Sequence, residues 1–133
     1  MTQMTIQVSD QYELEFQFSQ DQVNQFIALT GDDNPLHHDV EYAANTVFKK
    51  PIMHGFLSAT IFSTILGSHF PGKGTVYVSQ TLSFLRPMFV DTPYKGFVKV
   101  IAVNEEKKQC TLKTHVLNDR GKIMIKGEAT VIF

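Results

Sequence analysis

The stretch Phe56-Leu-Ser-Ala-Thr-Ile-Phe-Ser-Thr-Ile-Leu66 decides the fold, because as a helix it is apolar on most of its circumference. A helix with so little polar surface is typically buried on nearly every side. We expect it to begin near Gly55 and to end at Gly67. The stretch is too short and too interrupted by Ser and Thr to span a bilayer. The rest of the chain must therefore provide a cover for this helix.

The flanking segments predict that cover. The stretch Tyr12-Glu-Leu-Glu-Phe-Gln-Phe18 alternates apolar and polar side chains, which is typical of a half-buried strand. After the helix the period changes to two, and we expect strands at 76–84, 94–103, 109–117 and 122–133, the last two joined by the turn Asn118-Asp-Arg-Gly121. An antiparallel sheet that covers one apolar helix is an α+β architecture.

Shorter helices are expected between the first strand and the buried helix. Ser19 and Gln22 form a capping-box pattern, which opens a helix that Gly31 can terminate. Asp39 is expected to cap a second helix that runs to about Phe48. These elements leave no linker or repeat, so we treat residues 1–133 as a single domain.

The composition is that of an ordinary globular protein, with 43% apolar and 19% charged residues. The formal net charge is -1 and the basic residues are scattered, which argues against nucleic acid or a membrane surface as a partner. The single cysteine, Cys110, excludes an internal disulfide and is expected to pack in the core. The first residues, Met1–Thr5, do not resemble a signal peptide, so a soluble, cytoplasmic protein is expected.

One irregular segment holds a candidate for chemistry. Asp32, Asn34 and His37 lie where Gly31 and Pro35 force the chain out of regular structure. An Asp–His pair can hold a water molecule and transfer its proton, and Asn can fix such a loop. The same residues are also compatible with a plain turn and a half-buried packing histidine.

His54-Gly55 forms a second candidate, because it stands where the buried helix begins. The first amides of a helix have no partner within it and can stabilise a developing oxyanion. Ser63, further along, would offer a hydroxyl. The alternatives are that Gly55 only permits close packing and that Ser63 bonds to its own backbone. No metal site is expected, since no histidine has a cysteine or carboxylate at ligand spacing.

These residues match a known pattern. The stretches Phe26-Ile-Ala-Leu-Thr-Gly-Asp-Asp-Asn-Pro-Leu-His37, Pro51-Ile-Met-His-Gly55 and Tyr77-Val-Ser-Gln-Thr-Leu-Ser-Phe-Leu-Arg-Pro87 resemble the MaoC-like, (R)-specific enoyl-CoA hydratases. The resemblance spans almost the whole chain. It implies a hot-dog fold, in which an antiparallel sheet wraps a long central helix, and a homodimer with active sites near the subunit interface.

The resemblance also implies an activity, the reversible hydration of trans-2-enoyl-CoA to (R)-3-hydroxyacyl-CoA. The catalytic pair would be Asp32 and His37, with the Gly55 amide on the thioester oxygen, Asn34 supporting the loop and Ser63 supplying a hydroxyl. No cofactor is expected beyond the CoA of the substrate. Polyester precursor supply and fatty-acid metabolism are both compatible pathways, and the preferred chain length and the formal base stay open.

Three other functions compete with this interpretation. A hot-dog thioesterase would hydrolyse acyl-CoA, and a dehydratase acting on acyl-carrier protein would run the same chemistry in reverse. A non-catalytic acyl-CoA binding module would bind without turnover. The spacing of Asp32, Asn34 and His37 favours hydration, because a dedicated Asp–His water clamp suits addition to an alkene.

Overall fold

The computed structural model describes residues 5–133, so most of the N-terminal segment that we examined for a signal peptide lies outside it. A single six-stranded sheet has the order β1-β4-β5-β6-β2, with β3 paired to β6, and all pairings are antiparallel. The strands are β1 Gln11–Phe16, β2 Val76–Gln80, β3 Ser83–Phe84, β4 Tyr94–Asn104, β5 Gln109–Leu117 and β6 Ile123–Ile132. The helices are α1 Gln20–Thr30, the 3-10 turn η1 Pro35–His37, α2 Val40–Ala44 and α3 Gly55–Ser68.

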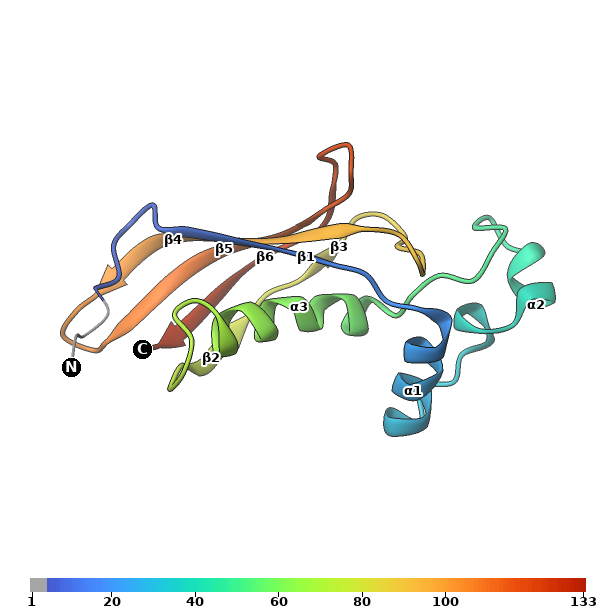
Figure 1. The fold of residues 1–133 in the computed structure, drawn as a ribbon, viewed down its shortest axis with the longest axis horizontal. Helices are drawn as coiled ribbons and strands as arrows, with labels where there is room; N and C mark the ends of the chain where they lie inside the picture. Colours follow the sequence, from blue (N-terminus) through green and yellow to red (C-terminus); the bar gives the residue numbers. More distant parts are fainter. Residues whose placement is uncertain (1–4) are drawn as a thin grey trace.

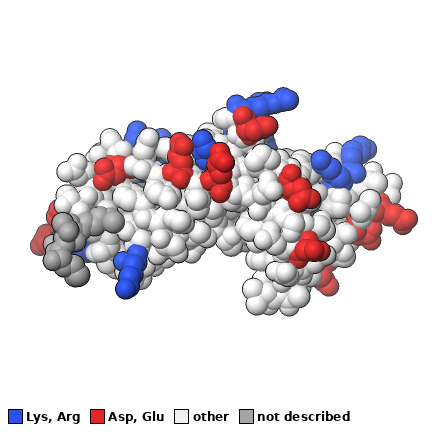
Figure 2. Space-filling view, in the orientation of Figure 1, with Lys and Arg blue, Asp and Glu red and all other residues white. Residues whose placement is uncertain are grey.

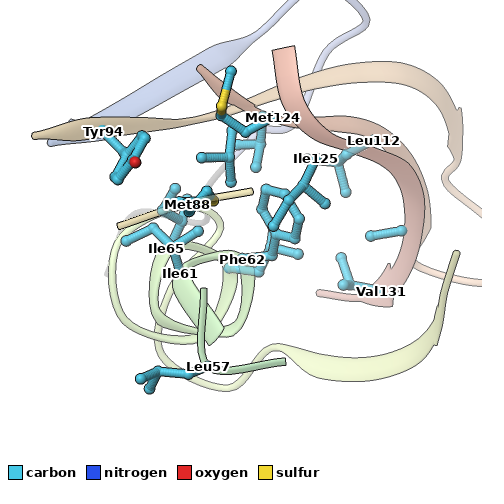
Figure 3. Packing of buried hydrophobic residues seen from close by; sticks show 14 of the residues in the cluster. Leu57, Ile61, Phe62, Ile65, Met88, Tyr94, Leu112, Met124, Ile125 and Val131 are labelled. Atoms are coloured by element: carbon cyan, nitrogen blue, oxygen red, sulfur yellow. The ribbon is translucent and has the colours of Figure 1, made fainter. Parts of the chain in front are cut away.

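The sheet arches over α3, while α1 and α2 stand at the end of the molecule where α3 begins (Figure 1). This is the arrangement of the hot-dog fold, and the predicted α+β class is confirmed. The packing is dense: Ile61, Phe62 and Ile65 of α3 lie against side chains of the sheet, among them Leu112 and Ile125 (Figure 3). Burying apolar side chains of this size contributes about 1.5–3 kcal/mol each to folding.

Helix α3 differs from its prediction in two ways. It continues past Gly67 to Ser68, because the His69 and Phe70 amides still donate to the Ile65 carbonyl, at 2.9 and 2.7 Å. Within the described chain, one stripe of residues along α3 is also exposed to solvent. That stripe begins at Phe56 and continues with the small and polar residues Thr60, Ser63, Thr64, Gly67 and Ser68.

The capping signals of α1 are confirmed. The Ser19 hydroxyl accepts from the Gln22 amide, and the Gln22 side chain accepts from the Ser19 amide. Gly31 ends the helix in the left-handed conformation, with φ of 79°.

Helix α2 is shorter than predicted, since it ends at Ala44 and not near Phe48. The Thr46 hydroxyl donates a hydrogen bond to the Ala43 carbonyl at 2.7 Å and accepts one from the Phe48 amide at 3.2 Å. A threonine that bonds to backbone groups in this way competes with helical bonding, so the chain turns there.

The long strand expected at 76–84 is divided into β2 and β3. At the break the chain passes over Gly127 of β6, where an added Cβ would clash with the Thr81 carbonyl oxygen. The Thr81 amide donates to the Glu128 carbonyl (2.9 Å), and the Glu128 amide donates to the Thr81 hydroxyl (3.0 Å). This crossing depends on a glycine far away in the sequence, which the local alternation of side chains cannot reveal.

None of the helices within residues 5–133 has the length and apolar character needed to cross a membrane. Acidic and basic side chains are interspersed on the face shown in Figure 2, which agrees with the small net charge.

The contact between α3 and β4 gives a test of the packing. An added Cβ at buried Gly96 would lie 2.7 Å from Cγ1 of Ile61 and 3.0 Å from Cδ1 of Ile65. We expect Gly96→Ala to lower the free energy of unfolding by about 1–3 kcal/mol through overpacking. Urea denaturation measures this change.

Gly67→Ala is the matched control, because nothing lies within 4 Å of a Cβ added at that helical glycine. It should raise the free energy of unfolding by about 0.4–1 kcal/mol. Equal stability of the two variants would contradict the tight contact at Gly96.

Candidate active site

The two segments singled out in the sequence meet at the N-terminus of α3. The loop after α1 carries Asp32, η1 carries His37, and His54 is the residue that precedes the first turn of α3. Single atoms of these three side chains, one carboxylate oxygen and two ring nitrogens, all lie within 4.8 Å of one another. Asp32 and His37 are thus brought together as predicted.

Asp32 is positioned by its backbone and keeps its carboxylate exposed in the described chain. Gly31 turns the chain out of α1, and the Asp32 amide then donates to the Thr30 hydroxyl at 3.2 Å. The Asp32 carbonyl accepts from Nε2–H of His54 at 2.9 Å. Hydrogen bonds therefore fix the backbone of Asp32, while its carboxylate oxygens remain available to bind another group.

His37 is oriented by the backbone of the neighbouring loop. Asn34 holds η1, because its side chain accepts from the Leu36 amide (3.1 Å) and its carbonyl from the His37 amide (3.0 Å). The bond to the Asn34 side chain agrees with the loop-fixing role expected of this residue, and that role stays a prediction. Nδ1–H of His37 donates to the Ile52 carbonyl at 2.8 Å. Neutral His37 consequently carries a free lone pair on Nε2.

Burial lowers the pKa of His37 below its ordinary value of 6.5. The bond to the Ile52 carbonyl and the Asp32 charge act in the opposite direction, and the rings of His54 and His38 add to the lowering. Near neutral pH the imidazole is therefore uncharged and able to accept a proton.

The trio Asp32, His37 and His54 is unsuited to holding a cation between the two rings. These rings stack with their centroids 3.8 Å apart and 29° between their planes. Nitrogen lone pairs lie in the ring plane, so stacked rings direct them side by side and not toward one point. Nδ1 of His37 and Nε2 of His54 are also already used as donors to carbonyls. The expected absence of a metal stays a prediction.

Gly55 begins α3, and its lack of a side chain permits a close contact. A Cβ at this position would lie 2.6 Å from Cε1 of Phe84, so the Phe84 ring can lie against the helix start only because residue 55 is glycine. His54 gives the helix no side-chain cap. The first amides are thus left for another acceptor, next to Asp32 and His37.

A pocket of about 410 Å³ opens beside this helix terminus. Its walls are mostly apolar and come from the loop before α3, from α3 itself and from the β3–β4 connection; they include His37, Phe48, Ile52, Met53, Gly55, Phe56, Ser58, Phe84, Leu85, Arg86, Pro87, Met88 and Ile125. A pocket with mostly apolar walls is suited to an apolar ligand.

Of the predicted site residues, His37 and Gly55 line this pocket, whereas Asp32 and Asn34 are not part of its lining, and neither is Ser63. It lies on the exposed stripe of α3, while the buried Ser58 lines the wall and donates to the His54 carbonyl at 3.2 Å. Ser58 could have been found from its helical spacing, because it lies one turn after His54 on the same face. The role assigned to Ser63 stays a prediction.

Comparison with known proteins agrees with this geometry. Residues 2–120 match the family described as MaoC like domain. The chain belongs to this family. The MaoC-like domain is 40% identical over 131 residues to the (R)-specific enoyl-CoA hydratase of Aeromonas caviae, covering 98% of each chain. It is 36% identical over 118 residues to the mitochondrial 3-hydroxyacyl-[acyl-carrier-protein] dehydratase of Arabidopsis thaliana, covering 86% of this chain and 70% of that protein.

Solved structures of similar proteins have the same fold. The structure of the (R)-hydratase from A. caviae involved in PHA biosynthesis matches with a TM-score of 0.94 and 40% identity, covering 98% of this MaoC-like domain and 99% of that chain. An unliganded R-hydratase of Pseudomonas aeruginosa matches with a TM-score of 0.89 and 35% identity, covering 96% and 81%.

The burial of His37 gives a pH prediction. Its folded pKa lies below 6.5, so the unfolded chain binds this proton more readily than the folded chain. The part of the stability due to this group should be present above pH 6.5 and be lost as the pH falls through the folded pKa. NMR titration of the imidazole should give a pKa below 6.5, and His37→Gln should weaken the loss of stability on acidification. A measured pKa above 6.5 would contradict the described burial.

Proposed function

We propose that this MaoC-like domain hydrates trans-2-enoyl-CoA to (R)-3-hydroxyacyl-CoA, reversibly. The observation that carries the proposal is the meeting of three features beside a mostly apolar pocket of about 410 Å³. Neutral His37 offers a free Nε2, the Asp32 carboxylate lies beside it, and the N-terminus of α3 at Gly55 has no side-chain cap. The similarity to the (R)-specific hydratase of A. caviae supports the same reaction.

The chemistry follows from this arrangement. A water molecule held by Asp32 and His37 attacks C3 of the enoyl thioester through its oxygen, while the pair takes one of its protons. The π electrons move to C2 and the thioester oxygen. The pair then returns the proton to C2 on the same face, so that one molecule of water has been added and the enzyme is unchanged.

In this proposal, the N-terminus of α3 stabilises the negative charge that develops on the thioester oxygen. As charge builds on the thioester oxygen, the Gly55 amide donates to it, and the dipole of α3 strengthens the donation. Asn34 supports the reaction indirectly by holding η1. No cofactor is required beyond the CoA of the substrate. We place the enzyme in the cytoplasm, because its single cysteine cannot form an internal disulfide.

Substitution of the pair tests the proposal. Asp32→Asn and His37→Gln should each lower kcat for crotonyl-CoA by about 10²- to 10⁴-fold, because general acid–base catalysis is removed. The assay follows the loss of enoyl-thioester absorbance, and chiral analysis of the product should give the (R) isomer.

His115→Gln is the matched control, since His115 lies on β5 away from the pocket. It should keep the wild-type kcat. Near-wild-type turnover by a folded Asp32→Asn or His37→Gln variant would contradict the assignment.

The competing activities have distinct readouts. A thioesterase would release free thiol from saturated acyl-CoA, which a thiol reagent detects. The similarity to an acyl-carrier-protein dehydratase makes that carrier the main alternative, and it is tested by comparing kcat/KM for the same acyl group on CoA and on the carrier protein. Tight binding of acyl-CoA without turnover would indicate a binding module.

The active form is a homodimer in this proposal. Strand β2 is at the edge of the sheet, and Val76, Tyr77 and Val78 are exposed in the described chain. An exposed edge strand that carries apolar side chains is a template for pairing with another chain.

The oligomeric state can be changed at this edge. Val78→Lys should shift the protein from dimer to monomer in light scattering after gel filtration, because a charge would be buried in the joint sheet. Leu29→Lys is the control: Leu29 is 84% exposed on α1, and its substitution should leave the dimer intact. A wild-type monomer at micromolar concentration would contradict the proposal.

A further inference from the structure

His54 has a position that the reaction scheme does not explain. It is 2% exposed, and its ring lies between Phe26 (centroids 4.8 Å apart) and His37 (3.8 Å apart). Its Nδ1 is buried and has no hydrogen-bond partner among the described residues. Such an unsatisfied buried group costs about 1–3 kcal/mol, which an apolar side chain in the same space would avoid. Packing alone therefore does not account for a histidine here.

The other nitrogen of His54 connects the two halves of the site. Nε2–H donates to the Asp32 carbonyl at 2.9 Å, across 22 positions of sequence. His54 is also the N-cap of α3, so its backbone leads directly into Gly55. One side chain thus determines how far the backbone of Asp32 lies from the helix terminus that receives the thioester oxygen.

The face of the His54 ring stacks on the ring of His37. The two rings would each carry a positive charge when protonated, and the repulsion between these charges contributes to the lowered pKa of His37. The other groups that act on His37 are the Asp32 carboxylate and the Ile52 carbonyl, which favour the proton, and His38, which opposes it. The stack therefore helps to keep His37 neutral while fixing the direction of its free Nε2.

We infer that His54 is a positioning residue of the proposed hydratase site, which ties the Asp32 loop to the start of α3 and holds His37 by stacking. The inference rests on the proposed function. It assigns His54 no contact with the reacting atoms. The substrate thioester meets Asp32, His37 and Gly55, and His54 acts through them.

Two variants separate the hydrogen bond from the stack. His54→Phe keeps an aromatic ring against His37 but loses the donor to Asp32. His54→Gln loses the ring but keeps an amide nitrogen near the place of Nε2. We expect His54→Phe to lower kcat for crotonyl-CoA by about 10²-fold with little change in KM, because misplacement of a catalytic group by about 1 Å has this cost. His54→Gln should recover about tenfold of that loss.

A second readout is independent of turnover. NMR titration should give a higher pKa for His37 in His54→Gln than in the wild type, because the neighbouring imidazole is removed. His115→Gln serves as the control in both measurements, and its kcat and the pKa of His37 should match those of the wild type.

The outcomes are decisive in either direction. A kcat for His54→Phe within about twofold of the wild type would overturn the inference. So would losses that are equal in both variants and follow their folded fractions, and so would an unchanged His37 pKa in His54→Gln. A wild-type protein that fails to hydrate crotonyl-CoA would instead overturn the proposed function, while the NMR comparison would still test the contact between His54 and His37.

Discussion

Helix α3 has so few polar positions that it can be stable only beneath the sheet, and the rest of the structure follows from that burial. Ile65 and Leu66 are fully buried, and Ile61 and Ile65 pack so close to Gly96 of β4 that no side chain would fit there. This contact determines where the helix lies and where it begins. The N-terminus of α3 consequently emerges at the end of the sheet, beside α1 and α2 (Figure 1).

The candidate site lies at this N-terminus of α3. A helix N-terminus without a side-chain cap attracts negative charge, and Gly55 lets the Phe84 ring close in beside it. The loop that carries Asp32 reaches the same place through the bond from His54 to its carbonyl. In the proposed reaction, these two segments would supply proton transfer and charge stabilisation, and the buried His54 side chain connects them.

Much of this was predictable where the determinants are local. The capping box at Ser19, the left-handed Gly31 and the hairpin at residues 118–121 each depend on a few neighbouring residues. The predictions failed where a distant residue decides. The strand at 76–84 is divided because Thr81 crosses β6 at Gly127. The serine on the pocket wall is Ser58, which was not singled out in the sequence, while the role assigned to Ser63 stays a prediction.

The sequence by itself determined the α+β class and the buried helix, and it singled out Asp32, His37 and Gly55 as candidate site residues, because periodicity, capping and a specific motif are properties of contiguous residues. Only the tertiary structure decided that His54 stacks on His37 and that His37 is oriented by the Ile52 carbonyl. It also decided which serine faces the pocket. These are contacts between segments remote in the chain, and their geometry exists only after the sheet has closed over α3.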